Sequence, residues 1–408
     1  MRRSPLLPIF LIVLVDVLGF TIVIPLLPLY ALKFGASDLV ATCITSTYAL
    51  CSLISTPIIG NLSDRFGRKR LLMISQSGTC MGFLVLAAAS SLWMVFLGRI
   101  VDGITAGNLA LAQAYISDHT KPEDRAKSFG IIGIAFGLGF MCGPGIGGWL
   151  GEIDPSYPFL LAASLSLTSM ICTYALLSDE KPPQADASPA AAAAAPVGPG
   201  GKRPSPLDLG LYLEYFRRPG LGPLFLQFFL FTFAFSCFTS GMALFAFGRF
   251  DWGARDTGLL FTYSGFLGIL WQGGLIGRMV KKWGEAKLAL AGFVAAGISY
   301  VLIGFSTTVG LLVVAATISS FGNGVLRPVL TAQITKAVGR HEQGTALGIS
   351  GSLSSVAMVL APVSGGFLLD HGDFTLWPMV SAFMITCALA VALARPHAPA
   401  SPAPSASA

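Results

Sequence analysis

Apolar residues occur along the chain in long blocks that are separated by short polar breaks. Most blocks reach the roughly 20 residues with which a helix crosses a bilayer. None alternates strictly between apolar and polar positions, as the strands of a membrane barrel do. The pattern therefore predicts twelve transmembrane helices, over these ranges: Leu6 to Leu32, Leu39 to Gly60, Leu71 to Ser90, Leu92 to Ile116, Ala126 to Leu150, Tyr157 to Leu177, Leu221 to Gly248, Thr257 to Val280, Leu288 to Phe305, Val309 to Thr335, Gly344 to Leu369 and Phe374 to Ala394.

The predicted helices form two sets of six around one long polar segment, Ser178 to Gly220. This segment holds an alanine run among several prolines and glycines, a composition that cannot bury a core. We expect a flexible cytoplasmic linker here and a disordered cytoplasmic tail of similar composition at the C-terminus. The predicted organisation is a six-helix bundle over 1–178, the linker over 179–220, a second six-helix bundle over 221–395 and the tail over 396–408.

The two halves carry related motifs. Gly60 to Gly67 follows the second predicted helix and Gly277 to Gly284 follows the eighth, 217 residues later. Gly143 to Gly148 (GPGIGG) in the fifth helix answers Ala361 to Gly366 (APVSGG) in the eleventh, 218 residues later. Two motifs with nearly the same offset indicate a duplicated six-helix unit.

The composition excludes a soluble protein. Hydrophobic residues make up 54% of the chain and charged residues 11%, where a soluble domain carries roughly 25% charge. So large an apolar surplus has to face lipid. The predicted fold class is an all-α integral membrane protein.

The distribution of Lys and Arg predicts the orientation. Most of the 26 basic residues fall in the two tails and in the breaks on the same side as the N-terminus, and basic residues accumulate in cytoplasmic loops. Both termini are therefore expected in the cytoplasm, in a multi-pass protein of the cell (inner or plasma) membrane. The net charge of +6 reflects this topology, and binding to nucleic acid is not needed to explain it.

Residues typical of metal sites and enzymes are not grouped. The seven cysteines lie in apolar blocks without C-x-x-C spacing, and the four histidines form no ligand cluster. No nucleophile and base arrangement, glycine-rich nucleotide loop or Walker lysine occurs. We expect no metal, no cofactor and no enzymatic activity.

Three motifs resemble those of the major facilitator superfamily. Gly60 to Arg70 (GNLSDRFGRKR) is similar to that family's loop between helices two and three, and Arg99 to Gly107 (RIVDGITAG) to its helix-four pattern. Gly139 to Gly148 (GFMCGPGIGG) is similar to the helix-five motif associated with antiporters. The resemblance implies twelve helices in two pseudo-symmetric six-helix bundles and transport by alternating access.

Within that superfamily the chain resembles the tetracycline-efflux branch of drug:proton antiporters. The residues that carry this resemblance are Leu14 to Leu29 (LVDVLGFTIVIPLLPL), Gly151 to Ala163 (GEIDPSYPFLLAA) and His341 to Gly344 (HEQG). The resemblance implies that protons are the coupling ion.

The same resemblance assigns gating to the loop after the second helix. It implies that Asp64 faces the N-terminal dipole of helix eleven, which begins near Gly344, and that Arg68 pairs with Asp118. These contacts would latch the cytoplasmic gate in the outward-open state. The remaining residues of this gating group are Gly60, Arg65 and Gly67.

Four ionisable residues lie deep inside the predicted spans, more than three residues from either end of a span, where each costs roughly 2.5 kcal/mol or more. They are Asp16, Arg99, Asp102 and Arg327. Burial favours the protonated form of a carboxyl, so Asp16 in the middle of the first span is the candidate proton carrier. The alternative is a carboxylate held in a structural pair or facing a wet cavity. Relatives of the efflux branch carry an aspartate at this motif position.

Arg99 and Asp102 are three residues apart and share a helix face, so they are expected to form a neutral pair. The helix-four arginine is implicated in proton coupling by the resemblance. Asp102 stands where relatives usually have an uncharged residue, which leaves a structural and a functional role open. We expect Asp16 to titrate and Arg99 to modulate its charge state.

The glycine-rich stretch of span five is explained by close helix packing and a proline bend. The resemblance places this helix against helix eight of the other half. The residues of this antiporter motif are Gly139, Gly143, Pro144, Gly147 and Gly148.

Polar residues within apolar spans are the candidates for a substrate cavity, with interhelical hydrogen bonding as the alternative. Phenylalanines of the seventh span add a candidate aromatic wall, although they occupy every face and most of them suit lipid contact. The polar candidates are Asn108, Gln113, Tyr115, Gln227, Gln272, Asn323 and Arg327.

The sequence departs from the tetracycline-efflux pattern at three positions. Gly82, Gly268 and Ala296 stand where the family has ionisable residues in spans three, eight and nine, which puts tetracycline itself in doubt as cargo. Arg327 is an additional cation that meets an anionic cargo or extends to the cytoplasmic surface.

Three functions fit the sequence. The first is proton-coupled efflux of small, largely apolar drug-like compounds by a monomer in the bilayer. The second is a symporter or facilitator for a metabolite, with an anion among the candidates. Transport that needs Arg327 but no proton gradient would favour it. The third, a non-transporting receptor or scaffold, would need a folded module outside the membrane.

Overall fold

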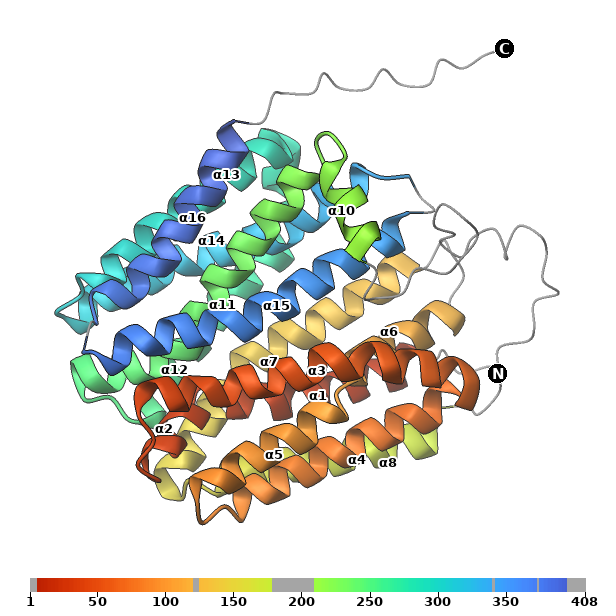
Figure 1. Cartoon of the computed structure of the whole chain (residues 1–408), viewed down its shortest axis with the longest axis vertical. Coiled ribbons are helices and arrows are strands. Elements are labelled where there is room, and N and C mark those ends of the chain that lie inside the picture. The colour runs from red at the N-terminus through yellow and green to blue at the C-terminus, as the bar shows by residue number, and fades with distance from the viewer. Residues whose placement is uncertain (1–5, 120–124, 178–208, 340–341, 373, 395–408) are drawn as a thin grey trace.

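The computed structural model describes residues 6–119, 125–177, 209–339, 342–372 and 374–394, and the described part contains helices and short turns but no strand (Figure 1). The all-α fold expected from the hydropathy pattern is confirmed. The helices are α1 (Leu6–Val23), α2 (Leu27–Leu32), α3 (Asp38–Phe66), α4 (Arg68–Ala87), α5 (Leu92–Ile104), α6 (Asn108–His119), α7 (Arg125–Ile153), α8 (Tyr157–Leu176), α10 (Leu209–Arg217), α11 (Gly222–Phe250), α12 (Ala254–Leu270), η1 (Trp271–Leu275), α13 (Ile276–Gly304), α14 (Val309–Lys336), α15 (Gln343–Asp370) and α16 (Leu376–Leu393).

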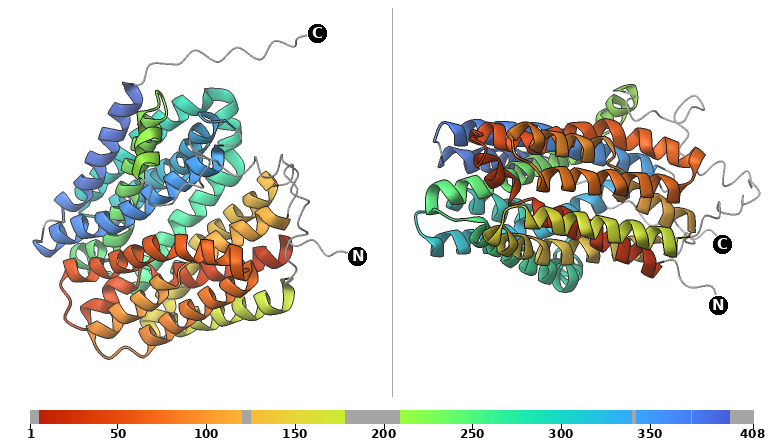
Figure 2. Two further views of the ribbon diagram at one scale, coloured as in Figure 1. Left: turned by 45° about the vertical axis from the view of Figure 1, so that its right-hand side comes forward. Right: turned by 90° about the horizontal axis from the view of Figure 1, so that it is seen from below.

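The helices are arranged in two bundles. Helices α1 to α8 pack together in an N-terminal bundle, and α11 to α16 pack together in a C-terminal bundle, as the red-to-yellow and green-to-blue halves of Figure 2 show. The two bundles meet along two long helix pairs, α3 with α15 and α7 with α12. We call the end at which α1 begins and α16 ends the terminal side, and the other end the opposite side.

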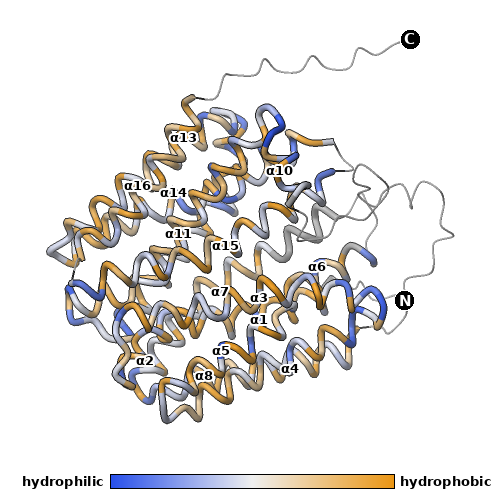
Figure 3. The backbone as a smooth tube through the Cα atoms, in the orientation of Figure 1, coloured by the Kyte–Doolittle hydropathy of each residue, from blue (hydrophilic) through white to orange (hydrophobic). Residues whose placement is uncertain are grey.

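Hydropathy varies along the length of the helices. Apolar residues dominate the middle of the helices and polar residues gather at their ends (Figure 3). Ten helices among the described residues are long and apolar enough to cross a membrane, and Pro8–Val23 is a shorter apolar helix. One of the ten, Ala254–Gly304, spans 51 residues because it joins two crossings that reverse direction at Gly284, where the backbone is not helical.

Several spans that the hydropathy pattern predicts as continuous helices are interrupted. The first is broken at Ile24 to Leu26, where Pro25 has no backbone N–H to donate. The fourth is broken at Thr105 to Gly107, between α5 and α6. The eighth passes through the π-helix η1, which contains two adjacent glycines. Hydropathy averaged over a whole span does not report these breaks, because each is only a few residues long.

The segment Gly60 to Arg70, expected as a loop, is almost entirely helical. Helix α3 continues to Phe66 and α4 begins at Arg68, so Gly67 alone forms the turn, with φ of 96°. Gly284, which is 217 residues later, reverses the chain in the same way with φ of 77°. Only glycine adopts this backbone conformation without a steric penalty, and its repetition agrees with the duplication inferred from the sequence.

The second repeated motif forms the contacts between the bundles on the opposite side. A Cβ on Gly148 of α7 would lie 2.5 Å from the backbone oxygen of Ala254 in α12. A Cβ on Gly366 of α15 would clash with Thr42 of α3. Glycines at both positions therefore allow the bundles to approach each other more closely than any side chain would permit.

Contact between the bundles decreases towards the terminal side. A Cβ on Gly137 of α7 would lie 3.1 Å from Ile269 of α12, but one on Gly133, one turn further, would meet open space. A Cβ would likewise meet no atom within 4 Å on Gly273 and Gly277, which follow α12, and on Gly348 in α15. Along α7 and α12, the bundles are thus in contact on the opposite side and separated on the terminal side.

Part of the expected flexible linker is structured. Residues 178–208 lie outside the described residues, but Leu209–Arg217 forms helix α10. The Tyr212 hydroxyl donates to Ser352 Oγ of α15 at 2.6 Å. The expectation of a wholly flexible segment up to Gly220 is therefore wrong for its last part, because aromatic residues there pack onto the C-terminal bundle. The predicted tail, after Arg395, lies outside the described residues.

Candidate functional site

Asp16 lies in the middle of α1 beside polar side chains from two other helices. The Gln76 amide of α4 and the Ser169 hydroxyl of α8 are close enough to act on the Asp16 carboxyl. Gln76 Nε2 donates to Ser169 Oγ at 2.8 Å, and Ser169 Oγ donates to the Ile12 oxygen at 3.3 Å. Asp16 Oδ1 and Gln76 Oε1 are both buried with no hydrogen-bond donor among the described residues. Two buried acceptor oxygens thus have no hydrogen atom to share in a hydrogen bond.

Arg99 and Asp102 form the ion pair that their spacing predicts. Arg99 Nη1 lies 3.2 Å from Asp102 Oδ2, and the two side chains are only 4% and 5% exposed. The guanidinium also stacks near the rings of Tyr48 and Phe83, at 5.7 and 5.3 Å from their centroids. Its Nε and Nη2 atoms are buried without an acceptor among the described residues, so Asp102 and the aromatic rings provide its compensation.

Gly82 of α4 faces Asp102 directly. A Cβ at Gly82 would lie 2.9 Å from the Asp102 Cβ and 2.8 Å from the backbone oxygen of Gly98. Any side chain at position 82 would therefore compete with Asp102 for the same space. Gly82, which stands where the resemblance puts an acid, is thus a direct neighbour of Asp102, the acid that the resemblance does not predict.

Tyr48 of α3 lies beside the ion pair, with its ring centroid 5.7 Å from the Arg99 guanidinium. Asp16, Arg99 and Asp102 all act electrostatically on its hydroxyl. The sequence analysis did not select Tyr48, Gln76 or Ser169. Polar residues within apolar spans were the available signal, but such residues are common and only their convergence distinguishes these three. We call Asp16, Tyr48, Gln76, Arg99, Asp102 and Ser169 the N-bundle cluster.

The C-terminal bundle holds Arg327 and its neighbours. Ser320, Gly324 and Arg327 share one face of α14 by helical spacing; Ser320 and Gly324 are buried, while Arg327 is exposed. A Cβ on Gly324 would lie 3.6 Å from the Trp271 Cβ and 3.9 Å from Gln272 Nε2 of η1. Arg327 therefore faces the interior side of its bundle, and Gln272 lies one turn away.

The other candidates for a substrate cavity are dispersed. The Asn323 amide accepts from Tyr300 at 3.2 Å and donates to Ser319 at 2.9 Å, which supports the role of interhelical hydrogen bonding. Tyr115 packs in the apolar core of the N-terminal bundle, and Gln227 is buried within α11. Gln113 is exposed and the Asn108 oxygen is buried without a donor among the described residues.

Phenylalanines of α11 are more buried than their distribution around the helix suggested. Phe225, Phe228, Phe231 and Phe233 all belong to the core of the C-terminal bundle. Lipid contact, the interpretation favoured from the sequence for most of them, is wrong for these four, because the helices around α11 enclose it.

At the terminal side, the turn around Gly67 carries an ionic network. Arg68 bonds Asp118 at the end of α6 with an Nε–Oδ2 distance of 3.0 Å and Asp64 with an Nη2–Oδ1 distance of 2.6 Å. It also bonds the Ser63 hydroxyl. The predicted pair of Arg68 with Asp118 is present. Gly344, near the start of α15, lies in open space, so Asp64 is held by its own bundle here.

A second ionic group fixes α10 to the start of α15. Arg218 bonds Glu214 at 2.9 Å and Glu342 at 2.8 Å, and its guanidinium lies 4.2 Å from the Tyr215 ring centroid. The Arg218 hydrogen bond lowers the pKa of Glu342, and hydrogen bonds to Glu214 and Glu342 raise the pKa of Arg218. Burial raises the pKa of the Tyr215 hydroxyl.

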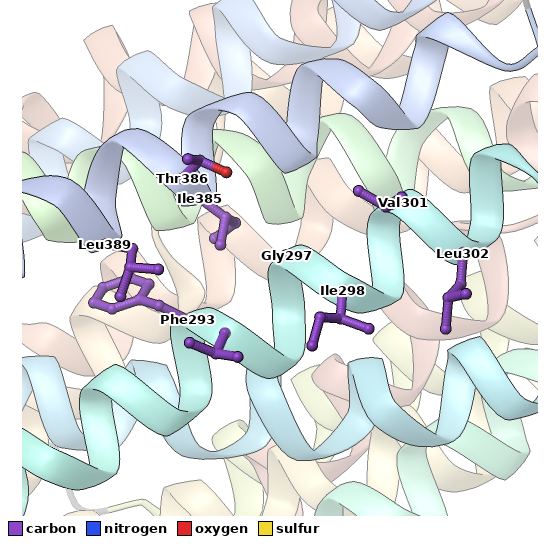
Figure 4. Close-up of a pocket in the computed structure, with 9 residues that line it drawn as sticks. Phe293, Gly297, Ile298, Val301, Leu302, Ile385, Thr386 and Leu389 are labelled. Carbon is purple, nitrogen blue, oxygen red and sulfur yellow. The ribbon is translucent and has the colours of Figure 1, made fainter.

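A groove of about 360 Å³ runs between α13 and α16 (Figure 4). Its walls are apolar and include Val294, Ile298 and Val301, which are 45%, 50% and 39% exposed. The groove belongs to the outer surface of the C-terminal bundle and contains no charged residue. It therefore suits hydrocarbon, and it is not part of either polar group described above.

Among the described residues, no group of His, Cys, Asp and Glu could hold a metal ion. The arrangement has instead one buried acid–amide group, one buried ion pair and one exposed cation, distributed over two bundles. Such groups can bind and release protons or solute ions.

Comparisons with known proteins show similarity over most of the chain. The model of the family described as Major Facilitator Superfamily matches residues 9–277 and 273–408. The chain is 31% identical to the class B tetracycline resistance protein of Escherichia coli, over 91% of each chain. It is 27% identical to multidrug resistance protein 1 of Bacillus subtilis, over 86% of each chain. The crystal structure of the human organic anion transporter MFSD10 (TETRAN) is similar in fold, with a TM-score of 0.70, 21% identity and coverage of 96% of this chain and 100% of that chain.

Proposed function

The chain belongs to the major facilitator superfamily, and from this premise we propose that it exports small, largely apolar drug-like compounds in exchange for protons. It is a transporter and not an enzyme. Alternating access requires two bundles that can separate on either side of the membrane, and the two contact pairs α3 with α15 and α7 with α12 support such a movement.

The terminal side is the cytoplasmic side in this proposal. Basic residues such as Arg65, Lys69 and Arg70 surround the turn at Gly67, and positive charge accumulates on the cytoplasmic side of bacterial membranes. The loss of contact beyond Gly137 and Ile269 then corresponds to an inward-open conformer. Cargo would enter from the cytoplasm into the space between the bundles.

Asp16 is the proposed proton carrier, and its unpaired oxygen is the observation that supports this role. Asp16 Oδ1 and Gln76 Oε1 are buried acceptors without a donor in the part of the chain that the structure describes, and buried acceptors of this kind cost roughly 1–3 kcal/mol each. One proton on the Asp16 carboxyl would supply the missing donor. Release of the proton would restore the deficit, so protonation is coupled to the packing of α1 against α4 and α8.

The experiment is transport in proteoliposomes with an imposed pH gradient, comparing the wild type with Asp16→Asn. We expect the variant to lose gradient-driven uphill transport, because an amide cannot carry a proton at this position. A matched control is Asp256→Asn at the start of α12, outside the cluster, which should transport normally. Undiminished gradient-driven transport by Asp16→Asn would refute the proposal.

Arg99 and Asp102 are proposed to set the charge state of Asp16. Asp102 acts electrostatically on Asp16, and Arg99 compensates Asp102 at 3.2 Å. Since Gly82 and Asp102 occupy adjacent space, Asp102 takes the place of the acid that the resemblance puts in span three. Gly268 and Ala296 also stand where the resemblance puts ionisable residues, so we propose a cargo other than tetracycline.

The network of Asp64, Arg68 and Asp118 is the proposed cytoplasmic latch. In the present conformer Asp64 is held by Arg68. In the outward-open conformer, approach of α15 would bring its positive N-terminal dipole to Asp64. Asp64→Asn should then shift the population toward inward-open conformers. Distances between spin labels on α3 and α15 at the terminal side measure this shift, and unchanged distances would contradict the latch.

A further inference from the structure

Arg327 is a cation without a counterion. Among the described residues no carboxylate lies within ion-pair distance of its guanidinium. The acids of the C-terminal bundle that the structure describes stand in the turns and at helix ends, at Asp251, Asp256, Glu285, Glu342 and Asp370. Arg99 in the other bundle, in contrast, has Asp102 at 3.2 Å. The C-terminal bundle thus carries an uncompensated positive charge within its membrane-spanning part.

Arg327 lies within α14, on a face of the helix that packs against its own bundle. It lies nine residues from Lys336, the end of α14, which is about 14 Å along a helix and longer than an arginine side chain. Its face of α14 also carries Gly324, which packs against Trp271 and Gln272. The side chain is nevertheless exposed, so it faces the space between the bundles that is open on the terminal side.

Other donors adjoin this cation. Gln272 Nε2 lies next to Gly324, one helical turn from Arg327. The indole Nε1 of Trp271 is buried and has no acceptor among the described residues. An arginine offers a planar fork of N–H donors that matches an oxyanion, and apolar walls concentrate its field toward a counterion.

We propose that Arg327 binds the anionic group of the cargo, which is an organic acid with an apolar body and one carboxylate or equivalent oxyanion. This inference rests on the proposed export function and names its substrate class. The two bundles then divide the work: the N-bundle cluster holds the proton, and Arg327 with Gln272 holds the cargo. The separation also keeps the cargo anion away from the carboxyls of Asp16 and Asp102.

The test is equilibrium binding to the full-length protein in phosphatidylcholine nanodiscs, without a proton gradient. Two fluorescent probes share one ring system and differ in charge: anthracene-9-carboxylate and 9-anthracenemethanol. The wild type should prefer the carboxylate by about tenfold or more, as expected for a charge-assisted hydrogen bond. Equal affinity for the two probes would overturn the inference.

Variants assign the preference to one residue. Arg327→Gln should lose the preference while its affinity for the alcohol stays unchanged, which also reports that the variant is folded. Arg278→Gln, which removes the same charge from the terminal part of α13, should keep the preference. If Arg327→Gln binds neither probe, the test is made with Arg327→Lys, which keeps the positive charge. A retained preference of this variant for the carboxylate probe supports the inference, and a lost preference refutes it.

A lipid phosphate has the same chemistry as the proposed cargo group. The titration is therefore repeated in nanodiscs that contain phosphatidylglycerol. Carboxylate binding that persists supports a cargo site, and complete displacement by the anionic lipid assigns Arg327 to a headgroup and overturns the inference. Because no gradient is used, the outcome is independent of whether Asp16→Asn abolishes proton-driven transport.

Discussion

Removal of the Asp102 charge should destabilise the protein more than any surface substitution. Asp102 lies 3.2 Å from Arg99, and both side chains are at least 95% enclosed. Asp102→Asn would leave the guanidinium buried without a counterion, since its Nε and Nη2 atoms already lack acceptors among the described residues. Breaking a buried pair from one side costs roughly 3–5 kcal/mol.

Removing both charges should cost less than the sum of the two single losses. Replacement of a whole buried pair by uncharged side chains is often close to neutral. In a double-mutant cycle of Arg99→Met and Asp102→Asn we therefore expect a coupling free energy of about 2 kcal/mol or more. The contacts of Arg99 with the Tyr48 and Phe83 rings should remain in part with methionine.

The assay is reversible unfolding in mixed micelles with increasing dodecyl sulfate, followed by tryptophan fluorescence. The matched control is the same cycle on Glu285 and Lys336, which are 2.6 Å apart while the lysine is 70% exposed. A pair whose lysine is largely exposed should show a coupling of roughly 1 kcal/mol or less. A cycle at Arg99 and Asp102 that is additive, or no larger than the control, would refute the reasoning.

Three further predictions address the turns, the helix packing and the α10 contact. Gly67→Ala and Gly284→Ala should each lower the free energy of unfolding by about 1–2 kcal/mol in the same assay, because these residues have φ of 96° and 77°. Gly60→Ala is the control and should lose no stability, because Gly60 is helical and its Cβ would meet no atom within 4 Å. Equal losses at all three positions would contradict the argument. Gly82→Ala should lower the free energy of unfolding by about 1–3 kcal/mol, because its Cβ would lie 2.8 Å from the Gly98 oxygen. Gly277→Ala is the control, since a Cβ there would meet no atom within 4 Å. Equal stability of the two variants would contradict the close contact at Gly82. Arg218 lowers the pKa of Glu342, so their bond stabilises the α10 contact above the unfolded pKa of about 4.5 and is lost as pH falls through the folded value. The protection factors of the α10 amides, which correct for the pH dependence of intrinsic exchange, should then fall below that pH in the wild type and be low at both pH values in Glu342→Gln. A wild type whose protection factors do not depend on pH would refute the pair.

The helical fold and the division into two related halves followed from the sequence because both depend on local patterns. Length and hydropathy select helices in lipid, and the repeated glycines at 67 and 284 mark turns that no other residue makes easily. The same reasoning failed for Gly60 to Arg70, which is helical on both sides of Gly67. Polarity predicts exposure to water, but a helix can continue beyond the bilayer while its residues are polar.

Part of the candidate site was also present in the sequence. The pairing of Arg99 with Asp102 and of Arg68 with Asp118 was expected from spacing and resemblance, and both pairs are present. Asp16 was found because a charge in an apolar span is rare. In contrast, Gln76 and Ser169 could not be selected, because an amide or hydroxyl in a membrane helix is common and carries no information about its partner.

The sequence by itself determined the secondary structure, the membrane character, the internal duplication and the few charges that need compensation, because each is a property of neighbouring residues or of composition. Only the tertiary structure decided which of these charges are compensated. It brings Gln76 and Ser169 to Asp16 and places Gly82 against Asp102, while it leaves Arg327 exposed. These relations join helices far apart in the chain, and their energies depend on distances of a few ångströms that no linear pattern encodes.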